Sequence, residues 1–486
     1  MSESPETAMP ASAERDYDLI VLGAGPAGEN VADYATKRGL RVAIVKAELV
    51  GGECSYWACM PSKALLRSGH ALRAARRLPG AREAITGGLD AEAVLARRDS
   101  FTSNWSDAGQ VDWLASAGIE LIRGHGSLAA PGLVQVGDRQ YSASAVALAT
   151  GSVPVLPAIP GLAEANPWGT REATATAQVP PRLIIIGGGV AGTELAFAFS
   201  SLGSEVTMLS RGALLSREEP FAGELVSAAL SGEGVQVRFG DTPVRVARDG
   251  QGIVSVHLED GTQLRAEELL VSTGRRPNTK GLGLEALGLD PHGALSVDDT
   301  MRVAGTDWLY AVGDVNSRSL LTHQGKYQAR AAAEAIAARL EGAPVSGEPW
   351  AKHAATADHA AVPRVVFSDP EVAAVGLTEH EARGKGLDIR VVELDLGAVA
   401  GASLHADASA GRANLVVEQT RQVVIGATFV GQDVSELLHA ATIAIIGEVS
   451  MNRLWHAVPA YPTVSEIWLR LLEEYHYPAI TVASGS

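Results

Sequence analysis

The 486-residue sequence predicts an α/β protein that ends in a separate α+β region. Two observations lead to this fold class. A strand, a glycine-rich turn, a helix and a second strand follow one another near the N-terminus, and the same order returns about 160 residues later. The last hundred-odd residues mix strands and helices without such a glycine turn. The chain is too long for one comfortable core, so we expect two to four domains.

The first of these units begins with the apolar run 18–22, which is typical of a buried strand. A helix is predicted over 26–38, with Gly39 as its stop, and a second strand over 41–45. The turn between the first strand and the helix reads G-x-G-x-x-G, formed by Gly23, Gly25 and Gly28. Glycines in this place let the backbone approach a pyrophosphate, whose charge the helix N-terminus favours. The unit is therefore predicted to be Rossmann-like and to bind a dinucleotide.

The end of the second strand departs from the usual dinucleotide fingerprint, in which an acidic residue holds a ribose hydroxyl. Lys46 occupies that position, and Glu48 lies two residues further on. Two interpretations of Glu48 remain open. It takes over the ribose contact, or it is simply a charge in a loop.

The second unit covers residues 182–211, and its glycines are Gly187, Gly189 and Gly192. The repetition predicts a second Rossmann-like domain and a second dinucleotide. The strand after this loop ends at Ser210 without an acidic residue, and Arg211 and Arg217 follow. Guanidinium groups match the geometry of a 2′-phosphate, which favours NADP over NAD. The alternative is that both arginines are solvated surface residues.

Composition and charge narrow the functional class. The net charge of −16 disfavours nucleic acid or an anionic membrane as a main partner. No apolar run is long enough to span a membrane, and the first 15 residues lack the layout of a signal peptide. We therefore expect a disordered tail over 1–15 and a cytoplasmic protein. An alanine-rich helix is predicted over 324–340, and residues 347–363 look like a linker.

Both cysteines of the chain, Cys54 and Cys59, lie five positions apart. Zinc sites normally combine a pair of cysteines with a second pair or with histidines at ligand spacing, and the sequence offers neither, so no metal site is expected. Residues five apart in a regular helix rise about 7.5 Å along its axis. A disulfide needs Cα atoms within about 7 Å. A bond between these thiols therefore requires a distorted turn, which Gly51, Gly52 and Pro61 can provide. A redox pair and two inert buried thiols remain the alternatives.

The stretch GGECSYWACMPSK at 51–63 resembles the active-site signature of the class I pyridine nucleotide-disulfide oxidoreductases. This family includes glutathione reductase, dihydrolipoamide dehydrogenase and mercuric reductase. The resemblance covers nearly the whole chain from residue 16, with further motifs at 149–151 (ATG), 274–279 (GRRPNT), 311–314 (AVGD) and 365–379 (VVFSDPEVAAVGLTE). It implies an FAD domain over 16–155 that is completed by 281–345, an NAD(P) domain over 156–280, a linker over 346–362 and a dimerisation domain over 363–486.

The resemblance also implies roles for individual residues. Cys59 would be the thiol beside the flavin, and Cys54 the interchange thiol that meets the substrate. Lys63 and Glu194 would form an ion pair close to the flavin and the nicotinamide, and Asp314 would bind the ribityl chain. Other cofactor-binding positions implied in this way are Gly52, Thr150, Gly151, Gly274 and Gly313. Hydride would pass from the nicotinamide to FAD, and electrons would pass on to the disulfide.

One motif departs from the family pattern. Disulfide reductases carry a His-Pro-x-x-x-Glu-like motif that is contributed across a homodimer and whose histidine moves protons. Tyr461 stands in the histidine position here, while Glu466 is retained. Tyrosine, with a pKa of about 10, is a poor base at neutral pH. His456, five residues upstream, is the other candidate for handling protons.

These observations predict an FAD-dependent NAD(P)H oxidoreductase that passes electrons through the Cys54–Cys59 disulfide to a disulfide or other small-molecule acceptor. Tyr56 and Trp57 add aromatic bulk between the thiols, which favours an altered acceptor. One alternative is a quinone (diaphorase-type) or mercuric-reductase-like enzyme that works without a histidine base. Another alternative is a redox-sensing flavoprotein that turns over slowly.

Overall fold

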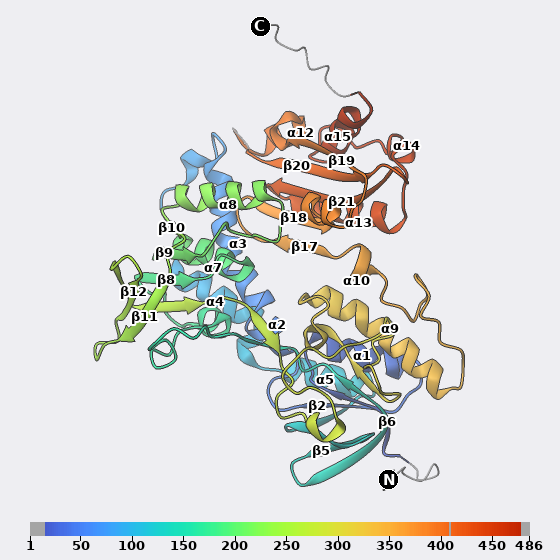
Figure 1. The fold of residues 1–486 in the computed structure, drawn as a ribbon. Helices are drawn as coiled ribbons and strands as arrows, with labels where there is room; N and C mark the ends of the chain where they lie inside the picture. The colour runs from blue at the N-terminus through green and yellow to red at the C-terminus, as the bar shows by residue number, and fades with distance from the viewer. Residues whose placement is uncertain (1–14, 408–409, 478–486) are drawn as a thin grey trace. The chain divides into compact units, whose positions relative to one another are not determined.

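The computed structural model describes residues 15–407 and 410–477 (Figure 1). The tail expected over 1–15 lies outside the described residues, apart from Arg15. The chain divides into two compact units, each assembled from three stretches of sequence. Among the described residues, the first unit comprises 15–52, 107–152 and 276–355, and the second comprises 53–106, 153–275 and 356–477 without 408–409.

The first unit is built on one sheet in the order β3-β2-β1-β6-β5-β4, with β16 also paired to β6. The strands are β1 (Tyr17–Leu22), β2 (Val42–Lys46), β3 (Glu120–Arg123), β4 (Gly126–Ala130), β5 (Leu133–Val136), β6 (Arg139–Leu148) and β16 (Leu309–Ala311). The pairs β3–β2, β2–β1, β1–β6 and β6–β16 are parallel, whereas β4, β5 and β6 pair antiparallel. The central strand β1 is buried from Leu19 to Leu22 because it is covered on both faces.

Two helices of this unit lie side by side, α1 (Pro26–Lys37) and α9 (Thr322–Leu340) (Figure 1). The buried faces of both helices are rich in alanine, and small side chains allow the two backbones to approach. The predicted helix over 26–38 is confirmed to within one residue, and that over 324–340 begins two residues earlier. A third helix, α5 (Ala108–Ser116), precedes β3.

The second unit contains a four-stranded parallel sheet in the order β10-β9-β8-β14 and a three-stranded antiparallel sheet, β11-β12-β13. The strands are β8 (Arg182–Ile186), β9 (Glu205–Ser210), β10 (Gln236–Phe239), β11 (Pro243–Arg248), β12 (Val254–Leu258), β13 (Gln263–Ala266) and β14 (Glu268–Val271). Helices α6 (Thr170–Ala175), α7 (Val190–Ser201) and α8 (Pro220–Gly232) accompany them. The repeated strand–loop–helix–strand pattern is therefore confirmed as two Rossmann-type sheets, one with parallel strands extended by antiparallel ones and one wholly parallel.

The same unit holds the segment with both cysteines, in α2 (Gly52–Tyr56), α3 (Cys59–Arg76) and α4 (Ala91–Phe101). Leucines of α3 share one apolar core with α7.

The C-terminal region forms an antiparallel sheet in the order β17-β18-β21-β20-β19. Its elements are β17 (Pro363–Val366), β18 (Glu371–Gly376), β19 (Ile389–Asp395), β20 (Arg412–Glu418), β21 (Val423–Gly431), α10 (Ala357–Ala360), α11 (Glu379–Gly384), α12 (Ala400–His405), α13 (Leu438–Ile446), α14 (Met451–Leu454) and α15 (Glu466–His476). The predicted α+β region is confirmed. Among the described helices, none combines the length and the apolar character that crossing a membrane requires.

Candidate redox and dinucleotide sites

The two cysteines lie on either side of a break between helices. Cys54 is in the short helix α2, and Cys59 is the first residue of α3. Ala58, the N-cap residue of α3, has φ −132° and ψ −96°, outside the helical region. The chain therefore bends between the cysteines, as a bond between two thiols at this spacing requires. Both side chains are half-buried. A thiol in the first turn of a helix has a thiolate stabilised by the helix N-terminus.

Lys63, one turn after Cys59, forms the predicted ion pair with Glu194 of α7. Its Nζ lies 2.7 Å from Glu194 Oε2 and 4.9 Å from the centre of the Phe367 ring. The other carboxylate oxygen of Glu194 accepts a hydrogen bond of 3.0 Å from the Phe367 backbone N–H. Glu194 is only 3% exposed, so this buried charge is neutralised by a cation and a backbone donor together. The sequence did not indicate Phe367, because a backbone donor leaves no residue-type signal.

A second ion pair adjoins the cysteine segment. The carboxylate of Glu53, which precedes Cys54, accepts a hydrogen bond from the guanidinium of Arg275. Gly274, a predicted cofactor residue, has a φ of +131° that favours glycine, and its carbonyl accepts the Val155 N–H at 3.0 Å. Gly274 was expected from the sequence as a cofactor residue, whereas Arg275 was not. Through Arg275, the motif GRRPNT therefore also holds Glu53, the residue next to Cys54, in place.

The first glycine loop fits a dinucleotide pyrophosphate. A Cβ on Gly28 would lie 1.9 Å from the Gly23 carbonyl oxygen, and one on Gly23 would lie 2.3 Å from the carbonyl oxygen of Ala149. A Cβ on Gly25, the N-cap of α1, would meet no atom of the described residues within 4 Å. Two glycines thus allow the turn to close, and the third leaves open space in front of the helix N-terminus. A Cβ on Gly52 would lie 2.8 Å from the Gly25 Cα, which accounts for glycine there.

The other predicted FAD residues of the first unit lie in a hydrogen-bonded cluster. Asp314 accepts a bond of 2.5 Å from the Ser152 hydroxyl. Thr150 Oγ1 donates to the Asn278 carbonyl at 2.7 Å, and the Asn278 N–H donates to the Gly151 carbonyl at 2.9 Å. One further bond, from the Gly313 N–H to Gln328 Oε1 at 2.8 Å, ties the AVGD motif to α9. The buried Gln328 was not singled out from the sequence, because α9 shows only its alanine pattern there.

Glu29 directly follows Gly28, the last glycine of the first loop, and was not expected as a site residue from the sequence. Glu29 Oε1 is buried and accepts no hydrogen bond from the described residues. Burial raises the pKa of Glu29 to about 7, although Lys326 and Lys46 both oppose the shift. Glu48 lies on the exposed surface, and its carbonyl accepts a 2.7 Å bond from Arg123. A buried carboxyl with spare hydrogen-bonding capacity beside the loop fits the polar groups of a nucleotide.

The second glycine loop repeats the same geometry in the second unit. A Cβ on Gly192 would lie 2.2 Å from the Gly187 carbonyl oxygen, whereas one on Gly189 would meet nothing within 4 Å among the described residues. Gly189 is the N-cap of α7. Arg211 and Arg217 are both exposed beyond the end of β9. The loop therefore fits a second pyrophosphate, with two guanidinium groups on the surface that follows it.

The residues expected to handle protons lie in the C-terminal region. Tyr461 is 77% exposed, and His456 is also exposed. Glu466 begins α15 and is 8% exposed, and its Oε2 has no hydrogen-bond partner among the described residues. Val458, at 88% exposure, and Leu404, at 65%, are apolar side chains that face solvent in the same region.

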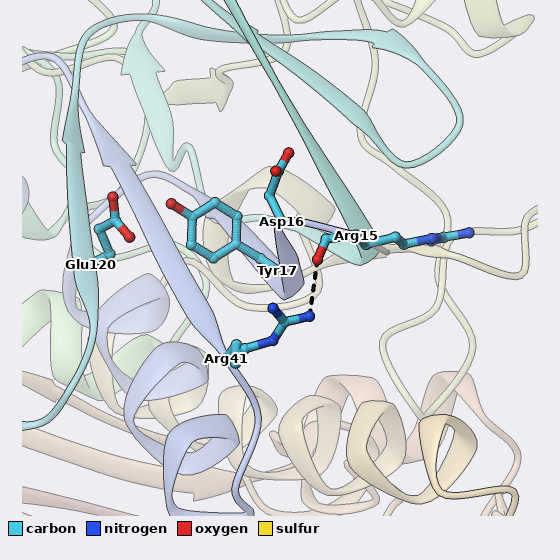
Figure 2. Close-up of a pocket in the computed structure, with 5 residues that line it drawn as sticks. All are labelled: Arg15, Asp16, Tyr17, Arg41 and Glu120. Carbon is cyan, nitrogen blue, oxygen red and sulfur yellow. Dashed lines mark hydrogen bonds between the residues drawn. The ribbon is translucent and has the colours of Figure 1, made fainter. Parts of the chain in front are cut away.

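A pocket at the opposite end of the first sheet lies away from the glycine loop. Figure 2 shows its lining, in which the Arg41 guanidinium donates to the Arg15 carbonyl at 2.9 Å. Tyr17, Arg41 and Glu120 stand at or just before the amino ends of β1, β2 and β3. Burial and then Glu120 raise the pKa of Tyr17 above its usual value. Ligands of parallel α/β sheets bind at the carboxyl ends of the strands, so this pocket is not the dinucleotide site.

His70 on α3 is half-buried, and its protonation makes the stability of the fold depend on pH. Burial, and then the Arg73 guanidinium, lower its pKa to about 4, while Asp369 opposes the shift. Between pH 6.5 and about 4, His70 is protonated in the unfolded chain but neutral in the folded chain. Stability is therefore lost as the pH falls below 6.5.

We expect His70→Gln to remove most of this pH dependence, which amounts to on the order of 2 kcal/mol. Thermal midpoints at pH 7.5 and pH 5 measure it, and the exposed His380→Gln variant should keep the wild-type dependence. Equal pH dependence in wild type and His70→Gln would contradict the prediction.

The paired thiols, the two glycine loops and the buried ion pair define an oxidoreductase that uses a flavin and a nicotinamide nucleotide. The model of the family described as pyridine nucleotide-disulphide oxidoreductase matches residues 17–337, and that of its dimerisation domain matches residues 362–471. The chain belongs to this family, and it is a flavin-dependent enzyme of the NAD(P)H:disulfide type. The family assignment made from the sequence is therefore confirmed.

Several relatives are similar over nearly the whole chain. A mercuric reductase from Staphylococcus aureus is 30% identical over 472 residues, which covers 96% of this chain and 83% of the relative. A mercuric reductase from Shigella flexneri is 34% identical over 471 residues (92% and 79%). A dihydrolipoyl dehydrogenase from Thermus scotoductus is 32% identical over 477 residues (96% and 99%).

Among solved structures, the HOCl-induced flavoprotein disulfide reductase RclA from Escherichia coli superposes with a TM-score of 0.80. It is 26% identical, and the match covers 94% of this chain and 99% of RclA. The Cu(II) complex of RclA gives a TM-score of 0.81 at 25% identity, covering 95% and 99% of the two chains.

Proposed function

We propose that the chain passes electrons from NADPH, through FAD, to the Cys54–Cys59 pair and on to a small-molecule acceptor. The observation that carries this proposal is the position of Cys59 at the N-terminus of α3, one turn before the Lys63–Glu194 pair. The helix end and the nearby ammonium group both favour a thiolate at Cys59. When bound, FAD would supply the chemistry of accepting a hydride and of passing its two electrons on to the thiols.

The same proposal divides the chain by function. Residues 16–155 and 281–345 hold FAD, residues 156–280 hold the nicotinamide nucleotide, and residues 363–486 form a homodimer. The family's dimerisation domain supports the last assignment. The exposed apolar side chains of Leu404 and Val458 support it further, because a dimer would remove them from water.

We propose an acceptor other than glutathione disulfide or lipoamide. In the dimer, Tyr461 would stand where related reductases place a histidine, and a phenol donates a proton better than it accepts one. Candidate acceptors are a quinone, a specialised disulfide and a metal ion; mercuric reductases and a Cu(II) complex occur among the similar proteins. Steady-state assays with each acceptor test this point. Fast turnover of glutathione disulfide or lipoamide would contradict it.

The test of the proposal as a whole is an anaerobic titration with NADPH. One equivalent should generate two thiols at Cys54 and Cys59, counted by alkylation and mass spectrometry, with a long-wavelength charge-transfer absorbance. A flavin that is reduced while both cysteines stay resistant to alkylation would support direct transfer from flavin to acceptor instead. Slow reduction of the flavin would support the redox-sensing alternative.

Preference for NADPH is proposed to depend on Arg211. We expect Arg211→Ala to lower kcat/KM for NADPH by about 10-fold or more, because a charge-assisted bond to the 2′-phosphate is lost. The value for NADH should stay within about twofold, since NADH carries no such phosphate. Steady-state kinetics with both nucleotides measure the ratio, and Arg265→Ala, elsewhere on this unit's surface, is the control. Equal losses for NADPH and NADH would refute this role.

A further inference from the structure

The backbone between the two thiols is held by side chains from distant parts of the second unit. Tyr56 is 1% exposed, and its hydroxyl donates to the Ser106 carbonyl at 3.4 Å. The Tyr56 carbonyl accepts a 3.2 Å bond from the indole N–H of Trp105. The last residue of α2 is therefore fixed both through its ring and through its backbone.

The next residue, Trp57, is fixed from helix α6. Its carbonyl accepts a bond of 2.8 Å from the Thr174 hydroxyl. Its ring carries the guanidinium of Arg171 at 3.7 Å from the ring centre. Arginine is planar and stacks on aromatic faces, and burial of part of the contact strengthens the attraction. Both carbonyls and both rings of the Tyr56–Trp57 pair thus have partners outside the cysteine segment.

The supporting side chains are themselves held in place. Arg98 is 1% exposed, lies over the Trp105 ring at 5.3 Å, and donates to the carbonyls of Thr174 and Thr176. Trp105 has a φ of +55°, which an L-residue adopts only where its surroundings impose it. The anchors on Tyr56 and Trp57 are therefore parts of one connected network.

We propose that Arg171 is a positioning residue that holds the bend between Cys54 and Cys59 and thereby lowers the midpoint potential of the pair. The inference rests on the proposed redox role of the two thiols. Reduction breaks one S–S bond, takes two electrons from NADPH by way of the flavin and two protons, and yields two thiols. Cys54 and Cys59 are two thiols in this structure, and the backbone between them is already bent at Ala58. A disulfide at this spacing requires such a bend, whereas two separate thiols do not. Contacts that stabilise the bend therefore favour the disulfide.

Arg171→Gln removes the stacked cation and keeps a polar side chain. We expect the equilibrium constant for reduction of the pair to rise about tenfold, which corresponds to a potential about 30 mV higher. The measurement uses the holoenzyme equilibrated in dithiothreitol buffers of known ratio, with alkylation of Cys54 and Cys59 counted by mass spectrometry. Thr174→Val, which deletes the bond to the Trp57 carbonyl, should shift the equilibrium in the same direction.

Arg390→Gln is the matched control, because Arg390 lies over the Tyr475 ring at 5.0 Å in the C-terminal region. Its dithiol equilibrium should equal that of wild type. An unchanged or lowered potential in Arg171→Gln and Thr174→Val overturns the inference. If wild type itself forms no dithiol with NADPH, the proposed function fails first, so the two failures are distinguishable.

Discussion

Cys59→Ser is expected to lower NADPH-dependent turnover of the physiological acceptor by at least about 10³-fold. Cys54 and Cys59 are proposed to act as one catalytic unit, and removing one member of such a unit abolishes most of the rate. Serine cannot form the disulfide, and its hydroxyl is not ionised by a helix N-terminus as a thiol is. Cys54→Ser should lose the same turnover. The two variants should differ in their spectra, because only Cys59 is proposed to lie beside the flavin. Rapid-mixing absorbance and steady-state rates measure both effects.

Ser55→Ala is the control variant, because it changes a neighbouring side chain of α2 without removing a thiol. It should retain most of the activity. The double variant with serine at both positions separates the mechanisms. Full quinone reduction with no disulfide turnover would show that flavin delivers electrons directly to quinones. Undiminished turnover of every acceptor in Cys59→Ser would contradict the proposed role of the pair.

The second large effect is expected at a buried ion pair between α3 and the C-terminal region. Arg73 Nε lies 2.6 Å from Asp369 Oδ2, and Arg77 Nη2 lies 2.9 Å from Oδ1. The side chains of Arg73 and Asp369 are 6% and 8% exposed. Burial opposes ionisation of Asp369, but Arg77 and Arg73 together hold its pKa below the usual value. The carboxylate is thus charged in a place where charge is costly unless it is paired.

Asp369→Asn should destabilise the protein by about 3–5 kcal/mol, because it leaves the buried Arg73 guanidinium with only the more distant Glu233 carboxylate, at 3.9 Å, as a counter-charge. The thermal midpoint should fall by several degrees in a calorimetric scan. Glu473→Gln breaks an exposed pair with Arg470 and should cost no more than about 1 kcal/mol. Equal effects of the two substitutions would contradict the argument from burial.

The Asp369 pair also bears on the site. Phe367, two residues earlier, donates its N–H to Glu194 and carries Lys63 over its ring. A C-terminal segment that is loosened at Asp369 would release these contacts. We therefore expect Asp369→Asn to lower activity below its melting temperature as well, through the Lys63–Glu194 pair.

Much of the fold could be predicted from local patterns. Glycine at three spaced positions after an apolar run specifies a strand-to-helix turn, so both dinucleotide loops followed from the sequence. The spacing of the cysteines and helix geometry required a bend between them for any disulfide that joins them. These features depend on residues within about 20 positions of one another, where dihedral preferences and periodicity act.

The sequence by itself determined the two glycine loops, the redox segment and, through the family's motifs, the pairing of Lys63 with Glu194. Only the tertiary structure decided which groups surround them: the Phe367 N–H on Glu194, the Arg171 guanidinium on Trp57, and Glu29 buried near Lys46 at the first loop. Partners such as Trp57 and Arg171 lie more than 100 positions apart in the chain. No local periodicity joins them, because their contact arises when packed helices bring distant side chains together and exclude water between them.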